Sequence, residues 1–128
     1  QIGGSAKGRT MIVEQEVMAR FMDMKVGFEM GYSRWMHDWF DPKGNINGMR
    51  NDRLLFDSDW NWIMPVIEKI NREYIGGKFE ISTHYVQYKN EELGIEERFV
   101  SINIIGNAGL LLVKVIKQLN EINNAKTN

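Results

Sequence analysis

The segment DSDWNWIMPVIEKI, residues 57–70, constrains the fold of this chain more than any other. Asp57 or Ser58 can accept a hydrogen bond from the free amides that begin a helix, and Asp59 in the first turn suits the positive end of the helix dipole. The apolar residues that follow recur at helical spacing: Ile63, Val66, Ile67 and Ile70. The segment therefore predicts an amphipathic helix that buries one face against another element.

Two features leave open whether this helix is continuous and which of its tryptophans is buried. Pro65 lacks the amide that would bond to the carbonyl of Asn61, so the helix either kinks there or begins again with Pro65 in its first turn. Trp60 and Trp62 lie two positions apart and cannot share one face of a helix. At least one of them should lie off the apolar stripe, either as a lid over the core or as a contact for a partner.

Hydrophobic periodicity predicts further elements on both sides of the helix. They are a helix at 12–24, an extended aromatic segment at 27–40 interpreted as a long loop or irregular hairpin, strands at 78–88 and 97–105, and a helix at 108–122. The second strand should turn Val100, Ile102 and Ile104 inward. This order predicts an α+β fold, in which an antiparallel sheet of three to four strands packs with three helices as an α-β-α sandwich.

Both ends of the chain are expected to lie outside the domain. QIGG resembles the C-terminal end of a SUMO fusion tag and SAKGRT reads as linker, so residues 1–10 are set aside as a tag remnant. With two prolines in the chain and no internal repeat, residues 11–123 are predicted to form a single α+β domain. The Asn- and Lys-rich tail at 124–128 is expected to fray.

Composition narrows the classes of function. Two of the 16 basic residues lie in the tag remnant, which leaves a net charge near −3 against 17 acidic residues. This charge disfavours direct nucleic-acid binding and attachment to a membrane surface, since both need a basic excess. The sequence has no cysteine and no apolar run of the roughly 20 residues that span a bilayer. We expect a cytoplasmic protein.

Three segments carry a resemblance to a known family: ARFMDMK at 19–25, FDSDWNWIMPVIEKI at 56–70 and LLLVKVIKQLN at 110–120. They are similar to segments of the phage ABA sandwich family, a group of small phage and prophage proteins. The resemblance implies action in the cytoplasm of an infected bacterium, and it brings no general activity with it. Asp23 stands where the family usually has glycine, and the aromatic segment at 27–40 is richer than in the family.

The sequence offers few catalytic candidates. It contains two histidines, His37 and His84, and no nucleophile-elbow, phosphate-loop or dinucleotide motif. Two distant histidines without cysteine are a weak start for a zinc site, which needs about four ligands. The carboxylates between Glu91 and Glu97 are explained more simply as the solvated part of a hairpin. We therefore predict a protein that is not an enzyme and that takes no cofactor or metal.

The residues that suit binding gather in the aromatic segment and just after it. They are Arg34, Trp35, His37, Trp39, Lys43, Arg50, Arg53 and, at the start of the central helix, Trp60. Aromatic faces beside cations bind nucleobases and phosphates, or anchor a protein interface. The alternative is that Trp35 and Trp39 pack in the core and the basic residues are solvated.

Together with the resemblance, these residues indicate a phage-encoded binding protein that counters a host antiviral defence. It would bind a defence protein, as anti-CRISPR inhibitors do, or sequester a nucleotide second messenger, in the second case at the subunit interface of a homo-oligomer. An inhibitor would use acidic residues such as Glu91 to Glu97, whereas a nucleotide sponge would use Arg34, Arg50 or Arg53. The alternatives are a small nucleotide-processing hydrolase and a structural or assembly accessory of the phage.

Overall fold

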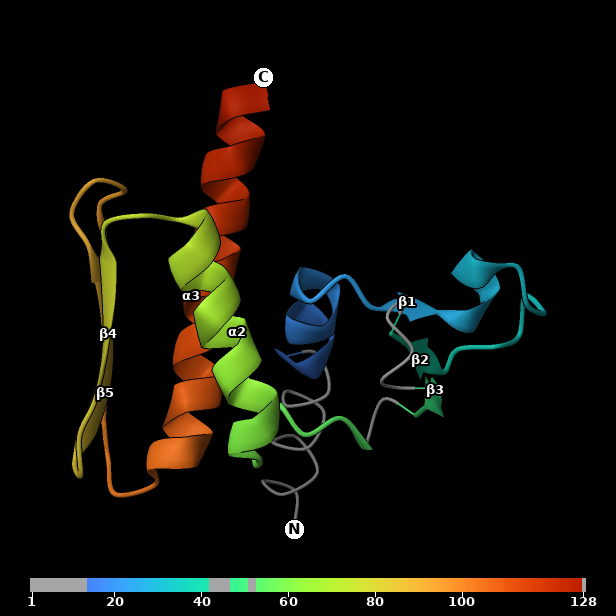
Figure 1. Cartoon of the computed structure of the whole chain (residues 1–128), viewed down its shortest axis with the longest axis horizontal. Helices are drawn as coiled ribbons and strands as arrows, with labels where there is room; N and C mark the ends of the chain where they lie inside the picture. Colours follow the sequence, from blue (N-terminus) through green and yellow to red (C-terminus); the bar gives the residue numbers. More distant parts are fainter. Residues whose placement is uncertain (1–13, 42–46, 51–52, 128) are drawn as a thin grey trace, which may run out of the picture. The chain divides into compact units, whose positions relative to one another are not determined.

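The computed structural model describes residues 14–41, 47–50 and 53–127 (Figure 1). Backbone contacts divide the chain into two compact units, Gln1–Leu55 and Phe56–Asn128, and each holds one three-stranded antiparallel sheet. Helices and antiparallel sheets together confirm the predicted α+β class. The predicted tag remnant at 1–10 lies outside the described residues, and a single domain over 11–123 stays a prediction.

The described part of the first unit starts within a helical segment, residues 14–21. The amides of Asp23 and Met24 donate to the carbonyls of Arg20 and Ala19, each at 3.0 Å, and Asp23 has a positive φ of 63°. This is the Schellman arrangement, in which the left-handed residue is usually glycine. Asp23 therefore occupies a position that costs an L-residue about 1 kcal/mol, and it ends the helix before the predicted residue 24.

A small sheet follows, with its strands in the order β1-β2-β3. These strands are β1 (Lys25–Val26), β2 (Trp39–Phe40) and β3 (Asn47–Met49). The connection from β1 to β2 begins with a 3-10 helix, η1 (Gly27–Met30). The extended conformation predicted for 27–40 is therefore wrong over η1. Within this segment only Trp39 and Phe40 form a strand, β2, which pairs antiparallel with β1.

The second unit begins with the helix that dominated the sequence, α2 (Trp60–Glu73). Its N-cap is Asp59, whose Oδ1 accepts a hydrogen bond from the amide of Asn61 at 2.8 Å, and the predicted caps at Asp57 and Ser58 are wrong. The helix runs through Pro65 without restarting. The predicted apolar face is confirmed, because its four members are all buried: Ile63, Val66, Ile67 and Ile70.

The second sheet has the order β4-β5-β6 and consists of two successive hairpins. Its strands are β4 (Gly77–Ile81), β5 (Tyr85–Asn90) and β6 (Ile95–Val100). The single strand predicted over 78–88 is wrong, because the chain reverses at residues 82–84, where the amide of Ser82 donates to the carbonyl of Tyr85 at 2.9 Å. The strand predicted over 97–105 lies earlier in the chain, as β6.

The inward face of β6 differs from the prediction. Val100 and Ile102 are 70% and 87% exposed, and Ile104 already belongs to the next helix. The residues opposite the buried Val86 and Tyr88 of β5 are instead Phe99 and Glu97. Side chains alternate between the two faces of a strand, so a register that differs by one residue exchanges inside for outside.

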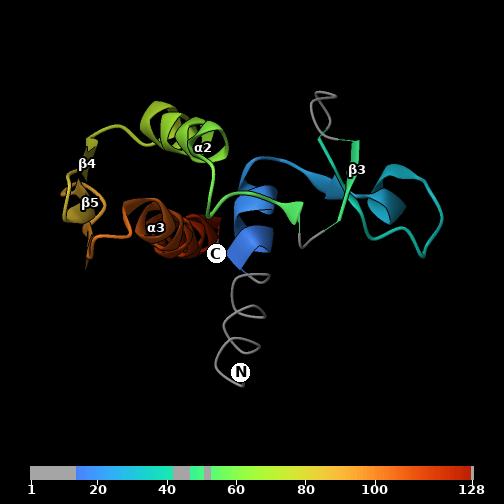
Figure 2. The same ribbon diagram turned by 90° about the horizontal axis from the view of Figure 1, so that it is seen from below.

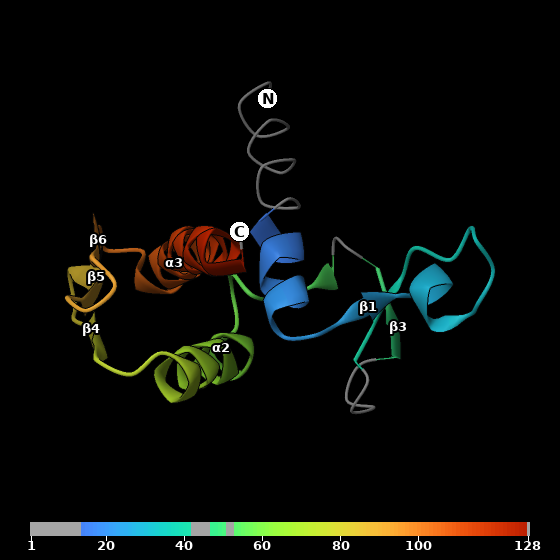
Figure 3. The ribbon, with the colours of Figure 1, turned by 90° about the horizontal axis from the view of Figure 1, so that it is seen from above.

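The last helix, α3 (Ile104–Thr127), lies beside α2 on one face of the sheet (Figure 2 and Figure 3). It is longer than the predicted 108–122 at both ends, and the tail predicted to fray is helical as far as Thr127. Most of the predicted apolar stripe is buried: Leu111, Leu112, Val115, Ile116 and Leu119. No helix among the described residues is long and apolar enough to cross a membrane.

The position of the α2 N-cap can be tested by a pair of alanine substitutions. Asp59→Ala removes the acceptor for the amide of Asn61 and should lower the free energy of unfolding by about 1 kcal/mol. Ser58→Ala, at an exposed neighbour, should leave it within about 0.5 kcal/mol. Urea denaturation of both variants measures the difference, and an equal loss from Ser58→Ala would place the cap at Ser58, one of the two residues that the sequence offered.

Candidate functional site

The residues predicted to bind a ligand are distributed over both units. Arg34, Trp35 and His37 lie exposed between β1 and β2, while Trp39, in β2, is 2% exposed and belongs to the core. Arg50 and Arg53 are exposed after β3, and the amide of Arg53 donates to the carbonyl of Arg50. Trp60 belongs to the second unit, where it is half-buried at the start of α2, and Lys43 lies outside the described residues.

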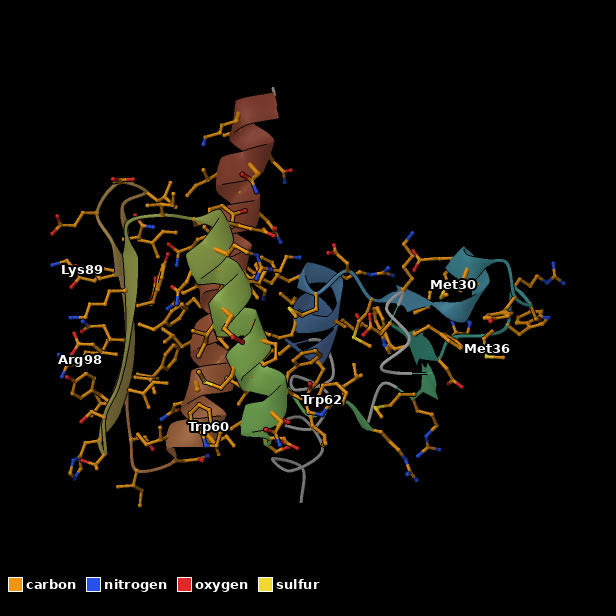
Figure 4. The ribbon with its side chains drawn as sticks, in the orientation of Figure 1. Met30, Met36, Trp60, Trp62, Lys89 and Arg98 are labelled. Atoms are coloured by element: carbon orange, nitrogen blue, oxygen red, sulfur yellow. The ribbon has the colours of Figure 1, made fainter. Side chains whose placement is uncertain are left out.

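Three of these side chains stand on the β1–β2 connection, residues 27–38. The backbone of the connection is bonded to itself: the amide of Gly27 donates to the carbonyl of Asp38 at 2.9 Å, and that of Phe28 to Met36 at 3.0 Å. A Cβ on Gly27 would overlap the Met36 side chain, so the two arms approach as closely as only glycine allows. The connection is thus a defined structure, with Met30 and Met36 on it (Figure 4).

The surface of the connection is unusually apolar. Phe28 is 43% exposed, Met30 39%, Tyr32 54% and Trp35 73%. The Arg34 guanidinium lies 4.8 Å from the centroid of the Trp35 ring. Exposure of Trp35 was one of the two alternatives that the sequence left open. The sequence did not indicate Phe28, Met30 and Tyr32 as members of a site, because their alternate spacing is also that of a strand with one buried face.

Arg20 of the helical segment binds the start of the β1–β2 connection through Glu29. Its Nη1 donates to Oε1 of Glu29 at 2.6 Å, and its guanidinium lies 4.8 Å from the centroid of the buried Trp39 ring. Oε1 of Glu29 also accepts from the amide of Val26 at 3.0 Å. The hydrogen bond from Arg20, and after it the one from Val26, lower the pKa of the Glu29 carboxyl below its ordinary value, because both favour the charged form.

A second surface with functional potential is the outer face of the β4-β5-β6 sheet, on which Lys89 and Arg98 point away from the helices (Figure 4). A shallow hollow of about 320 Å³ lies there, lined by Gly76, Lys78, Glu80, Gln87, Lys89, Glu91 and Glu92. The Tyr85 hydroxyl donates to Oε2 of Glu80 at 3.0 Å, and this bond to a carboxylate raises the pKa of Tyr85. The hollow contains no histidine.

The described part of the chain holds no group of three or more His, Asp or Glu side chains that could bind a metal ion. Its two histidines have contacts with neighbouring polar and aromatic groups. His84 shares a hydrogen bond with its neighbour Thr83, and His37 meets the ring of Phe28 edge-on at 5.4 Å between centroids. The exposed apolar side chains of the β1–β2 connection are therefore the feature with the clearest functional meaning.

Comparison of the chain with protein-family models, with curated proteins and with solved structures finds no match. The resemblance to the phage ABA sandwich family stays a prediction.

Trp35 and Trp39 form a matched pair for testing this assignment. Trp35→Ala removes a ring that is mostly in solvent and should change the free energy of unfolding by less than about 0.5 kcal/mol. Trp39→Ala empties a buried site and should cost about 3–5 kcal/mol. Thermal and urea unfolding of the two variants would measure this, and a comparable loss of stability from Trp35→Ala would place that ring in the core.

The pH dependence of the connection follows from Glu29. Because its folded pKa is lowered, the stabilisation from its bonds is present above the unfolded pKa and is lost as the pH falls through the folded pKa. NMR titration should show the carboxyl of Glu29 titrating below its ordinary value, and Arg20→Gln should bring the pKa back towards that value. Lys25→Gln, which removes the weakest of the charge effects, should move the pKa less; equal effects would contradict the assigned cause.

Proposed function

We propose that this protein is a non-catalytic binding protein that attaches to a protein partner through the β1–β2 connection. The observation that supports this most directly is the exposure of Phe28, Met30, Tyr32 and Trp35 within one short segment. Aromatic residues, methionine and arginine are the types enriched in protein interfaces, and a concentration of exposed apolar side chains marks such a site. Trp35, the most exposed of them, is the natural anchor.

The backbone bonding of the connection favours binding as well. A segment that is already folded loses little conformational entropy when a partner covers it. Two cross-connection hydrogen bonds and the pair of Arg20 with Glu29 hold the 3-10 helix in place before any partner arrives. The rings are therefore presented in a conformation that contact with a partner does not have to create.

Charge favours a protein partner over a nucleotide. A nucleotide site needs convergent cations for its phosphates, but residues 27–38 carry one arginine, Arg34, against two carboxylates, Glu29 and Asp38. Arg34 also lies over Trp35, so it occupies one face of the ring on which a base would stack. An apolar anchor with a single cation beside it suits the surface of another protein.

For the partner we propose a host antiviral defence protein, which this chain would inhibit during phage infection. The resemblance of the sequence to a phage family supports this partner. The acidic residues considered for such an inhibitor are divided: Glu91 and Glu92 are exposed at the turn after β5, whereas Glu97 faces inward and bonds to Lys114 and Gln118 of α3. The connection is therefore the better candidate for the inhibitory contact.

Phage plating on bacteria that each carry one defence system tests this function. The protein should restore plating against the system that it inhibits, and the purified defence component should bind it directly. Trp35→Ala should weaken that binding by about 30-fold, the effect of removing a hot spot worth about 2 kcal/mol, and should abolish restored plating.

The control is Ile75→Ala, which removes a side chain that is 79% exposed in the other unit. It should bind and restore plating as the wild type does. Unchanged binding by Trp35→Ala would exclude the connection as the contact surface, and consumption of a nucleotide by the purified protein would contradict a non-catalytic role.

A further inference from the structure

We propose that two copies of this chain pair through the edge of β4 and so join their sheets into one antiparallel sheet of six strands. This assembly uses the second unit and is independent of the β1–β2 connection. β4 is a terminal strand in the order β4-β5-β6, and no other described strand pairs with its outer edge. An edge of this kind presents amides and carbonyls that a second strand can bond.

The hairpin shows which backbone groups of β4 are free. Ser82 bonds to Tyr85 across the turn, and the register continues without a bulge to Gly77 opposite Asn90. Bonding alternates along an antiparallel pair, so Lys78 and Glu80 direct their backbone groups towards β5. Gly77, Phe79 and Ile81 consequently direct theirs towards the open edge.

An antiparallel copy of β4, related by a two-fold axis at Phe79, satisfies these groups reciprocally. Phe79 bonds to Phe79 of the second copy, and Gly77 bonds to Ile81 in both directions. The same register places Lys78 of each copy directly opposite Glu80 of the other, on the outer face of the sheet. Opposite charges in this position stabilise a strand pair, and like charges destabilise it.

The side chains of Lys78 and Glu80 differ in the contacts that they already make. Within the described part of the chain Lys78 forms no ion pair. Glu80 accepts hydrogen bonds from Tyr85 and Gln87, at 3.0 and 3.4 Å, which hold its carboxylate on the outer face. The edge thus carries one unpaired cation and one fixed anion, spaced so that a second copy of the same strand complements both.

The inner side of the edge is apolar. A groove of about 430 Å³ runs between α2 and β4, lined by Met64, Ile67, Asn71, Gly77, Lys78, Phe79 and Ile81. Met64 is 42% exposed and Ile81 46%. In the two-fold arrangement Ile81 of one copy lies opposite Gly77 of the other. The second copy would cover apolar surface that α2 leaves open.

Charge substitution with rescue tests this assembly by native mass spectrometry and sedimentation velocity of the full chain. The wild type should form dimers, and Lys78→Glu should weaken the dimer at least tenfold because it places two carboxylates opposite each other. Glu80→Lys should weaken it similarly, because it places two ammonium groups opposite each other. A mixture of the two variants should form a heterodimer, since the edge with two carboxylates then meets the edge with two ammonium groups.

Matched controls separate this surface from others. Arg98→Glu, on the outer face but in β6 at the far side of the sheet (Figure 4), should leave the dimer intact. Trp35→Ala should also leave it intact, so a failure of the β1–β2 connection as a binding surface does not affect this test. A wild type that stays monomeric at millimolar concentration, a dimer insensitive to Lys78→Glu, or variants that do not recombine would each overturn the proposal.

Discussion

The arrangement of the strands in the second unit depends on one buried side chain, the phenol of Tyr88. The side chain of Tyr88 is fully buried in the central strand, and its hydroxyl accepts a hydrogen bond from Nδ2 of Asn90 at 3.1 Å. Oδ1 of Asn90 in turn accepts from the amide of Leu93 at 3.2 Å, in the turn that leads to β6. Burying a hydroxyl and an amide without partners costs about 1–3 kcal/mol each, so the sheet is held to the arrangement that satisfies both.

The same phenol restricts β4 and the face of every strand. A Cβ on Gly77 would overlap the Tyr88 hydroxyl, so β4 has to begin with glycine, and the ring of Phe79 packs against that of Tyr88 at 4.4 Å between centroids. With Tyr88 inside, its neighbour Glu97 in β6 is inside too, where Lys114 and Gln118 of α3 neutralise and bond its carboxylate. A polar residue thus occupies an inward position because the register, and not its own hydropathy, decides its face.

This dependence on register explains which parts of the fold the sequence could predict. The apolar face of α2 was predictable, because four residues at helical spacing define one stripe whatever packs against it. The hairpin at residues 82–84 was not, since Ser, Thr and His replace the Gly and Asn that mark two-residue turns. The inward face of β6 could not be read from Val100 and Ile102 either, because it depends on the pairing partner in β5.

In the candidate site, too, the sequence could predict some features and not others. From the sequence, Asp23 could be recognised as a replacement for glycine. In the structure it has the left-handed backbone conformation that ends the first helical segment, and this conformation explains why glycine is usual at the position. Trp35 and Trp39 are the same residue type four positions apart, yet one is exposed and the other buried. The pairing of β2 with β1 and β3 and the cation of Arg20 decide this difference, and neither can be inferred from local sequence.

The separation of the two proposed surfaces has a consequence for binding. The β1–β2 connection belongs to the first unit and the β4 edge to the second, so the two surfaces share no residue. A dimer formed at β4 would carry two connections. When two contacts are linked, the second forms at a high effective concentration, and affinity rises without any new interaction in either contact. A symmetric partner would therefore be held much more tightly by the dimer than by the monomer, whereas a partner with one binding surface would not distinguish them.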